Sequence, residues 1–420
     1  MEKLVVTGGA ELNGSISVSG SKNASLPILA ATLLTREPCT IRRVPDVSDT
    51  NYMLQILRSL GAEVERASGT VTVCAENIHA DAPYDLVRKM RASICVMGPL
   101  LARLLEARVS LPGGCVIGDR PVDLHLKGLA ELGADVSVAS GDIIIKAENG
   151  LHGKRVHLFG KHGPTVLGTD NLIMAATLAK GTTIIEEAAC EPEVTDLVEF
   201  LNRMGAKIHG AGTRTITVEG VGQLHGADHT VIPDRIEAGT FVIAAAMAGK
   251  KVTVRRARAE HLESLFTVLR ESGYKIDVDG DRITTGRIDN PTGCELITEP
   301  YPGFPTDMQA QLTSLFATVP GISVVTEKIF PQRFMHVAEL NRMGANIQLE
   351  GATAIIKGVK KLGGAPVMAS DLRASAALVL AGLCADGETE INRLYHIDRG
   401  YEHIDEKLME LGANMRREKA

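Results

Sequence analysis

The sequence predicts an α/β protein assembled from six copies of one helix–strand unit. Three observations lead to this prediction. An apolar helical stretch that ends in glycine and continues into a short strand recurs six times, at intervals of 68–72 residues. Each copy also contains an earlier and more apolar helical stretch. Finally, 420 residues with 45% hydrophobic and 23% charged side chains are typical of a folded globular protein of two or three domains.

The first helix of each unit is the more apolar one. Helices that are apolar on most faces are buried, so we expect these six to form the interior. They span Lys22–Leu34, Arg91–Leu105, Thr165–Ala179, Arg235–Ala248, Asp307–Ala317 and Leu372–Leu383.

A strand-like run follows the first helix, as in residues 39–44, 182–185 and 251–254. The second helix then ends at a glycine, which is the usual residue just past a helix C-terminus because it adopts the left-handed backbone freely. The six glycines are Gly61, Gly133, Gly205, Gly273, Gly344 and Gly412. The unit therefore reads helix, strand, helix, strand, strand. Six copies suggest two domains of three units each, with an open array as the alternative.

Composition argues against several classes of protein. The formal net charge of −6 disfavours nucleic acid as a partner. No apolar run approaches the roughly 20 residues that cross a bilayer, and residues 1–9 resemble neither a signal nor a transit peptide. We therefore expect a soluble, cytoplasmic protein without a membrane partner. No Walker A pattern, strand–GxGxxG–helix pattern or histidine-rich metal spacing occurs, so we expect no metal and no cofactor.

Cations stand where helices begin, which is unfavourable because a helix N-terminus carries partial positive charge and a cation there forgoes about 0.3–1 kcal/mol. These cations are Lys22, Arg91, Arg235 and Arg373. One interpretation is a set of outward, solvated side chains. The other is that cations and free N–H groups together hold anions such as phosphate and carboxylate, and four occurrences at equivalent positions favour it.

Carboxylates also stand at helix starts, and each allows two interpretations. They are ordinary caps of their helices, or they belong to a site. The residues concerned are Asp234, Asp307 and Asp371.

A glycine-rich loop carries one cysteine of special interest. Gly113, Gly114 and Gly118 surround Cys115 and predict an exposed loop, in which Arg120 would favour the thiolate or orient an anion. A loop cysteine without function is the alternative. The other six cysteines lie in or beside apolar segments and are expected to be buried, reduced thiols, since the odd number and scattered spacing indicate no disulfide or zinc framework.

Later arginines and histidines carry weaker signals. Taken alone, Arg333 and Arg399 are typical of surface or ion-pair residues, and His125, His336 and His396 of structural ones.

Several segments resemble the enolpyruvyl transferases of the UDP-N-acetylglucosamine 1-carboxyvinyltransferase type, in order along essentially the whole chain. They include Gly20-Ser-Lys-Asn-Ala, Pro112-Gly-Gly-Cys-Val-Ile-Gly-Asp-Arg, Phe304-Pro-Thr-Asp-Met-Gln-Ala-Gln and His396-Ile-Asp-Arg-Gly-Tyr. The resemblance implies an inverse α/β prism of two similar lobes with three units each. One lobe would comprise residues 1–21 and 230–420; the other would comprise residues 22–229 and carry the Cys115 loop as a lid over a closing cleft.

The resemblance also implies the activity. The family moves the enolpyruvyl group of phosphoenolpyruvate to the 3′-hydroxyl of UDP-N-acetylglucosamine and releases phosphate, which opens peptidoglycan synthesis. Cys115 resembles the general acid and the residue that fosfomycin alkylates, and Asp307 resembles the base. Lys22 and Arg399 complete the catalytic set.

By resemblance, the phosphoenolpyruvate contacts are Lys22, Asn23, Arg120 and Arg399, with Arg333 and Arg373 nearby. Asp371 lies in the same matching segment as Arg373 and would be a further substrate-binding residue. The UDP-sugar contacts would be Arg91, Arg120, Pro121, Val122, Asp123, Leu124, Asp307 and Ile329. Residues 160–168 depart from the family's common Pro-Ser-Val-Gly-Ala-Thr pattern, and there the uridine contacts would fall on Thr165 and Val166.

Two alternatives stay open. A 5-enolpyruvylshikimate-3-phosphate synthase shares the fold but lacks the cysteine loop. A non-catalytic repeat protein that binds a nucleotide sugar would need neither the loop nor the acid and base candidates.

Overall fold

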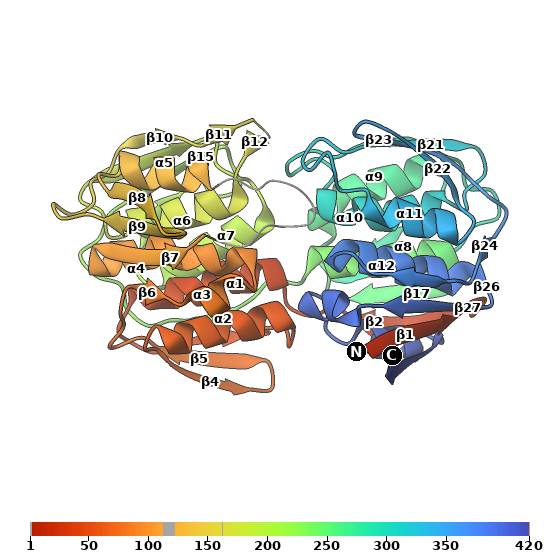
Figure 1. The fold of residues 1–420 in the computed structure, drawn as a ribbon, viewed down its shortest axis with the longest axis horizontal. Coiled ribbons are helices and arrows are strands. Elements are labelled where there is room, and N and C mark those ends of the chain that lie inside the picture. The colour runs from red at the N-terminus through yellow and green to blue at the C-terminus, as the bar shows by residue number, and fades with distance from the viewer. Residues whose placement is uncertain (1, 112–121, 162, 420) are drawn as a thin grey trace. The chain divides into compact units, whose positions relative to one another are not determined.

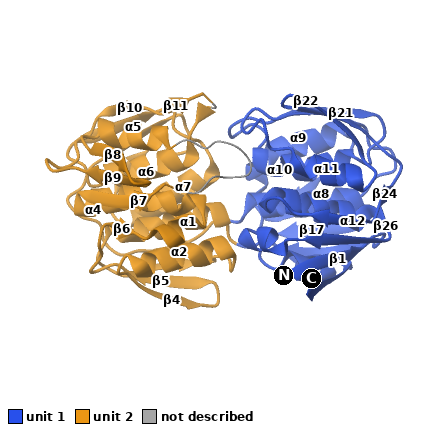
Figure 2. Cartoon of the chain, in the orientation of Figure 1, with its two compact units in different colours: residues 1–19, 116–118, 233–420 blue, residues 20–115, 119–232 orange. Residues whose placement is uncertain are grey.

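The computed structural model of the protein describes residues 2–111, 122–161 and 163–419. Within them the chain forms two compact units, coloured separately in Figure 2. Unit 1 contains the described residues of 1–19 and 233–420, and unit 2 those between 20 and 232. That the lobes 1–21 with 230–420 and 22–229 are separate folding domains stays a prediction.

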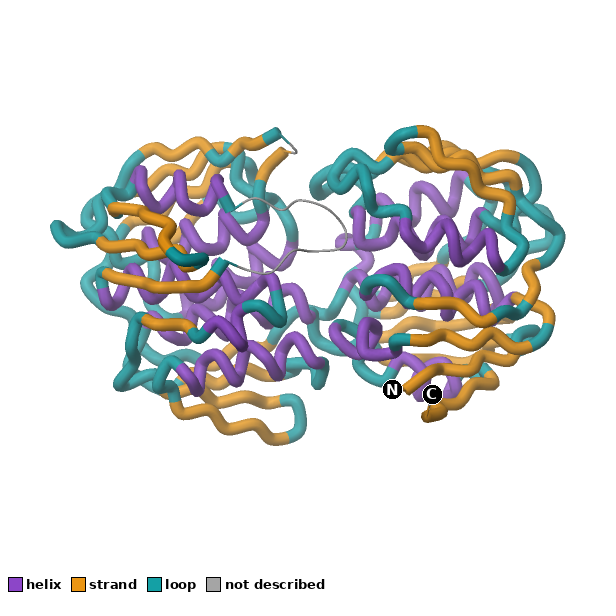
Figure 3. The backbone as a smooth tube through the Cα atoms, in the orientation of Figure 1, coloured by secondary structure: helices purple, strands orange, loops and turns teal. Residues whose placement is uncertain are grey.

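Three buried helices fill the inside of unit 1, and strands run along its outside (Figures 1 and 3). The buried helices pack against one another. α8 and α12 carry mostly small and aliphatic side chains, whereas α10 also buries the polar Gln309 and Gln311. They are α8 (Arg235–Ala248), α10 (Thr306–Phe316) and α12 (Leu372–Cys384). The more amphipathic helices and 3₁₀ turns are α9 (Glu263–Glu271), α11 (Met335–Arg342), α13 (Ile404–Glu410), η3 (Ala259–His261) and η4 (Leu394–Arg399).

Unit 1 has three four-stranded sheets and one small two-stranded sheet. In spatial order, the strands of the first sheet are β18 (Asp277–Asp279), β19 (Arg282–Thr285), β17 (Gly249–Arg255) and β2 (Leu12–Ser17). Those of the second sheet are β20 (Glu295–Ile297), β21 (Ile322–Thr326), β23 (Thr353–Lys357) and β22 (Asn346–Glu350). The others are β25 (Pro366–Met368), β27 (Glu388–Asn392), β1 (Glu2–Thr7), β28 (Asn414–Lys419), and β24 (Leu362–Gly363) with β26 (Ala385–Asp386).

Unit 2 repeats this plan. Its inner helices are α1 (Lys22–Ala31), extended by η1 (Thr32–Leu34), η2 (Arg91–Val96), continued by α4 (Met97–Leu104), and α6 (Val166–Ala176). The others are α2 (Ser48–Ser59), α3 (Tyr84–Val87), α5 (Asp123–Glu131) and α7 (Pro192–Arg203).

The sheets of unit 2 have the same strand order. They are β16 (Asp228–Thr230), β3 (Cys39–Arg42), β5 (Thr70–Cys74), β4 (Glu63–Ala67); β6 (Asp81–Ala82), β7 (Glu106–Ser110), β9 (Asp142–Lys146), β8 (Asp135–Ala139); and β10 (Arg155–His157), β13 (Thr182–Glu186), β15 (Thr215–Glu219), β14 (Lys207–His209). β11 (Phe159–Gly160) pairs with β12 (Gly163–Pro164).

The predicted α/β fold and its repeat are confirmed. Each of the six glycine positions has a positive φ between 91° and 104°, as a left-handed helix stop requires. The first-helix ranges hold to within about one helical turn. The Thr165–Ala179 stretch begins its helix one residue later, with Thr165 as N-cap, and the Arg91 stretch begins as a 3₁₀ turn.

Each large sheet also contains a fourth strand that the repeat unit lacked. This strand pairs in parallel with the first strand of the unit, as Asp228 of β16 does with Thr40 of β3. In the sixth unit the third strand is supplied by β1, where Val5 pairs with Glu390 of β27 on one side and with Arg416 of β28 on the other. The predicted order is therefore wrong for that copy.

In the described residues, no helix is long and apolar enough to cross a membrane.

Candidate active site

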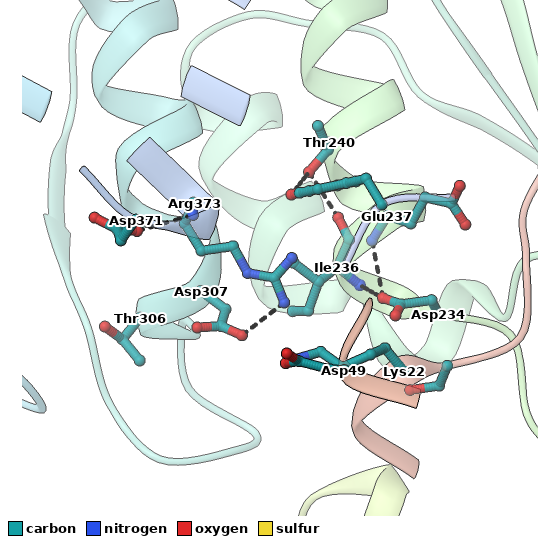
Figure 4. Close-up of polar contacts among 12 residues, drawn as sticks. Lys22, Asp49, Asp234, Ile236, Glu237, Thr240, Thr306, Asp307, Asp371 and Arg373 are labelled. Carbon is teal, nitrogen blue, oxygen red and sulfur yellow. Dashed lines mark hydrogen bonds and ion pairs between the residues drawn. The ribbon is translucent and has the colours of Figure 1, made fainter. Parts of the chain in front are cut away.

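The starts of two buried helices in unit 1 bring a carboxylate and two arginines together. Asp307 is the second residue of α10, Arg373 the second residue of α12, and Arg333 precedes α11. Arg373 Nη2 donates to Asp307 Oδ2 at 2.8 Å, as Figure 4 shows, and Arg333 Nη1 donates to Asp307 Oδ1 at 2.8 Å. The side chains of Arg373 and Arg333 are only 2% and 6% exposed, and that of Asp307 is 24% exposed.

The two arginines determine the charge of Asp307. Burial alone would raise the pKa of this carboxyl, but Arg373 and Arg333 hold the pKa well below its usual range. Asp307 is therefore ionised at neutral pH and is a weak base while both guanidiniums donate to it. Binding of an anion that attracts either arginine would make the carboxylate more basic.

Among the three carboxylates at helix starts, two are caps. Asp234 accepts from Ile236 N and Glu237 N at 2.8 and 2.9 Å (Figure 4). Asp371 accepts from Arg373 N and Ala374 N at 2.9 and 3.1 Å. The cap interpretation is wrong for Asp307, because the N-cap of α10 is Pro305 and the Asp307 oxygens bond arginines instead.

Arg373 is supported from its other side by a buried aromatic ring. Its guanidinium carbon lies 5.3 Å from the centroid of the Tyr401 ring. The Tyr401 hydroxyl in turn lies 2.9 Å from Thr240 Oγ1 and accepts from Gln311 Nε2 at 3.1 Å. This network orients Arg373, and none of its three supporting residues had a distinguishing signal in the sequence.

Arg399 lies at the end of η4 and is half-buried. Burial lowers the pKa of His396, the positive charge of Arg399 lowers it further, and the negative charge of Asp371 opposes the shift. His336 is buried, and burial lowers its pKa to about 4, with Asp371 opposing and Arg333 adding to the effect. Both histidines are thus neutral at pH 7, and their structural role stays a prediction.

In unit 2, Lys22 and Asn23 are the first two residues of α1, and Ser21 caps the helix by accepting from Ala24 N at 3.2 Å. Lys22 Nζ lies 3.2 Å from Asp49 Oδ2 in the first turn of α2 (Figure 4). The side chains are 12% and 4% exposed, so Asp49 holds the ammonium in place. No pattern in the sequence pointed to Asp49.

Arg91 begins η2 and is half-buried. Burial, and to a smaller extent the positive charge of Arg91, lowers the pKa of His125 in α5 to about 3. The neutral His125 ring contacts Asn171 Nδ2 through Nδ1 at 3.0 Å, and Asn171 Oδ1 accepts from Gly98 N at 2.8 Å. These bonds tie α6 to α4 and α5.

The described residues among the remaining predicted contacts of unit 2 lie at helix starts. Val122 is the N-cap residue of α5, Asp123 is exposed and Leu124 is half-buried. Thr165 caps α6 by accepting from Gly168 N at 3.2 Å, and Val166 follows it. Cys115, Arg120 and Pro121 lie outside the described residues.

The solvated interpretation of the helix-start cations is wrong for three of the four. Arg373 and Lys22 are held by carboxylates, as described above. Arg235 is 8% exposed and lies 5.5 Å from the centroid of the Tyr301 ring.

The six described cysteines carry free thiols. Cys39 and Cys95 are buried, and burial raises both pKa values, that of Cys39 to about 11. The other four are only half-buried, so the prediction that all six are buried is wrong for Cys74, Cys190, Cys294 and Cys384. Among the residues that the structure describes, no group of three or more His, Cys, Asp or Glu side chains could hold a metal ion.

Comparison with known proteins decides the family. The family model described as EPSP synthase (3-phosphoshikimate 1-carboxyvinyltransferase) matches residues 6–408. The UDP-N-acetylglucosamine 1-carboxyvinyltransferase of Akkermansia muciniphila is 63% identical over 419 residues, and that of Methylacidiphilum infernorum 57% over 418, each covering 99% of both chains. The chain belongs to the enolpyruvyl transferase family. The predicted resemblance and enzyme class are confirmed.

Solved enolpyruvyl transferases have the same fold. The enolpyruvyl transferase NikO from Streptomyces tendae aligns with a TM-score of 0.91 at 27% identity, covering 100% of this chain and 99% of that one. An EPSP synthase from Acinetobacter baumannii aligns with a TM-score of 0.76 at 17% identity over the full length of both chains. The predicted fold class is therefore that of the family.

Proposed function

We propose that this enolpyruvyl transferase moves the enolpyruvyl group of phosphoenolpyruvate to the 3′-hydroxyl of UDP-N-acetylglucosamine and releases phosphate, the first committed step of peptidoglycan synthesis. The observation that carries the proposal is the Arg373–Asp307–Arg333 cluster, in which one carboxylate is held between two buried cations. Relatives at 51–63% identity, all of them UDP-N-acetylglucosamine 1-carboxyvinyltransferases, support this choice of substrates.

In unit 1 the proposed roles follow from charge. Arg373, Arg333 and Arg399 attract the phosphate and carboxylate of phosphoenolpyruvate. An arginine that turns toward the substrate withdraws from Asp307, whose pKa then rises. Asp307 thus becomes a competent base for the sugar 3′-hydroxyl only when the anionic co-substrate is present.

In unit 2 the proposal assigns phosphoenolpyruvate contacts to Lys22 and Asn23, with Asp49 as the group that keeps the ammonium in place. The UDP-sugar contacts proposed from the resemblance are Arg91, Arg120, Pro121, Val122, Asp123, Leu124, Thr165, Val166 and, from unit 1, Asp307 and Ile329. Asp371 is proposed as a further substrate-binding residue of unit 1.

We propose Cys115 as the general acid. Its thiol proton goes to the methylene carbon of phosphoenolpyruvate while the sugar oxygen bonds to the adjacent carbon, which gives a tetrahedral ketal. Loss of a proton from the new methyl group then expels phosphate and restores the double bond. The buried Cys39 and Cys95 cannot replace Cys115, because both side chains are 0% exposed and a substrate cannot reach their thiols.

The proposed reaction predicts phosphate release when the protein is incubated with phosphoenolpyruvate and UDP-N-acetylglucosamine, and no release when either is omitted. Phosphate is measured colorimetrically. Shikimate 3-phosphate in place of the nucleotide sugar is the discriminating control, because turnover with it would indicate the EPSP synthase alternative. A folded protein that binds UDP-N-acetylglucosamine without releasing phosphate would support the non-catalytic alternative.

The Cys115 assignment predicts a separation between activity and inhibition. Cys115→Asp is expected to retain phosphate release, since a carboxylic acid can donate the proton, and to lose inactivation by fosfomycin, since the thiol nucleophile is gone. Cys115→Ser is expected to lose nearly all turnover. Inactivation of Cys115→Asp at the wild-type rate would refute the assignment; Cys74→Ser, at a half-buried thiol, is the control that should change neither property.

Both proposed substrates are water-soluble anions, so we also propose that the protein acts in the cytoplasm without a nucleic-acid or membrane partner. Recovery of the native protein in a washed membrane fraction would contradict this location.

A further inference from the structure

A second carboxylate lies next to the Asp307 cluster in unit 1. Glu327 follows β21 directly and is fully buried. Its Oε1 accepts from Thr298 Oγ1 at 2.7 Å, from Ile329 N at 2.8 Å and from Phe330 N at 2.9 Å. Glu327 therefore holds the turn that carries Ile329, one of the proposed UDP-sugar contacts.

The other oxygen of Glu327 reaches the Asp307 cluster through one hydroxyl. Thr306 Oγ1 donates to Glu327 Oε2 at 2.8 Å and accepts from Arg333 Nη1 at 3.1 Å. The same Nη1 donates to Asp307 Oδ1 at 2.8 Å. Arg333 Nε is buried and has no hydrogen-bond partner in the described residues, so the Nη1 bonds largely determine how this guanidinium is oriented.

We propose that Thr306 and Glu327 are positioning residues that give Arg333 a second acceptor besides Asp307. The inference rests on the proposed function, in which Asp307 is the base and Ile329 a sugar contact. When substrate draws Arg333 away from Asp307, its bond to Thr306 and the charge of Glu327 stabilise the turned guanidinium. A buried cation without such a partner would instead stay on Asp307 and keep that carboxylate a poor base.

The arrangement also links the two substrates' contacts. One carboxylate holds the Ile329 turn with Oε1 and the Thr306–Arg333 pair with Oε2. A displacement of Ile329 by the bound sugar would therefore reach Arg333 through three hydrogen bonds in series, Ile329 to Glu327, Glu327 to Thr306 and Thr306 to Arg333. Neither Thr306 nor Glu327 was among the site residues that the sequence indicated.

Three variants separate the two roles of Glu327, which are to hold the Ile329 turn and to hold the Thr306 hydroxyl that Arg333 contacts. Thr306→Val removes only the hydroxyl and is expected to lower kcat by about tenfold or more, with KM for UDP-N-acetylglucosamine changed less than about twofold. Glu327→Gln keeps an acceptor for the Ile329 turn but points an N–H donor at Thr306, so the same pattern is expected. Glu327→Ala removes the turn's acceptor and is expected to raise that KM about tenfold as well.

Conservative and matched variants exclude a general loss of structure. Thr306→Ser keeps the hydroxyl and is expected to stay within about threefold of the wild-type kcat. Thr326→Val is the control, because Thr326 Oγ1 pairs with Thr353 Oγ1 at 3.1 Å and not with Glu327. Because Thr306 and Glu327 act through the same chain of hydrogen bonds, the effects of their substitutions should not add. The kcat of the double variant Thr306→Val/Glu327→Gln is therefore expected to lie within about threefold of that of the poorer single variant.

An unchanged kcat in Thr306→Val, a Thr306→Ser variant as impaired as Thr306→Val, or additive losses in the double variant would each overturn the proposal. A wild-type protein that releases no phosphate would instead defeat the proposed function. In that case the hydrogen-bond chain from Glu327 through Thr306 to Arg333 is tested without turnover. The same double-mutant cycle is measured as free energies of unfolding in denaturant, and the Ile329 turn is followed by hydrogen exchange of its backbone amides. Additive stability losses, or slow exchange at Ile329 and Phe330 retained in Glu327→Ala, would overturn it.

Discussion

Replacing Asp307 with asparagine is expected to lower the rate of phosphate release by about 10²- to 10⁴-fold, the usual contribution of a general base. The amide cannot take the proton of the sugar hydroxyl. It also carries no charge to neutralise Arg373 and Arg333, which both donate to the Asp307 carboxylate at 2.8 Å in the wild-type protein. The measurement is steady-state phosphate release with both substrates saturating, so that the loss appears in kcat.

Asp405→Asn is the matched control for that experiment. Asp405 is also a carboxylate of unit 1 held by an arginine, since Arg417 donates to its two oxygens at 2.7 and 2.9 Å. Burial would raise the pKa of Asp405, but Arg417 lowers it, as the arginines do for Asp307. Asp405→Asn is expected to cost stability while kcat is preserved. Equal losses of kcat in both variants would show that Asp307 acts only as a structural ion pair.

Truncating Leu312 to alanine is expected to destabilise unit 1 by about 2–5 kcal/mol. Leu312 lies on α10 and is 0% exposed, and α10 packs against α8 and α12 in the interior of the unit. The alanine leaves a cavity beside α10, the helix whose first turn carries Thr306 and Asp307. The loss is measured as the shift of the guanidinium chloride unfolding midpoint multiplied by the slope of the transition.

Leu349→Ala supplies the comparison for Leu312→Ala within the same unit. Leu349 is on β22 and is 45% exposed, so the same truncation there is expected to change the free energy of unfolding by less than about 0.5 kcal/mol. Comparable losses at the two positions would mean that the inner helices are not the core that stabilises unit 1.

Much of the fold was readable along the chain because its signals are local. The apolar stretches identify helices such as α8, whose predicted and observed ranges agree at Arg235–Ala248. The glycine stops follow from the backbone of single residues, as at Gly61 and Gly344. Most of the parallel fourth strands had no such signal, because strands such as β6 with two residues and β16 with three are too short to show a period.

The candidate site divides in the same way. The unfavourable charge of Arg373 at a helix start and the acid at Asp307 are properties of sequence position, so both could be singled out in advance. Glu327 and Asp49 could not, because neither stands in a pattern along the chain that distinguishes it from the other acidic residues. They became apparent only through the hydroxyl and the ammonium that each of them holds.

Helices, stops and the repeat depend on interactions between residues a few positions apart, and the amino-acid order alone decided those features of this enolpyruvyl transferase. Whether Asp307 caps its helix or bonds arginines depends on partners 26 and 66 positions away. Such distant partners meet only when α10, α11 and α12 pack, so the ionised state of Asp307 and its link to Glu327 were decided by the tertiary structure.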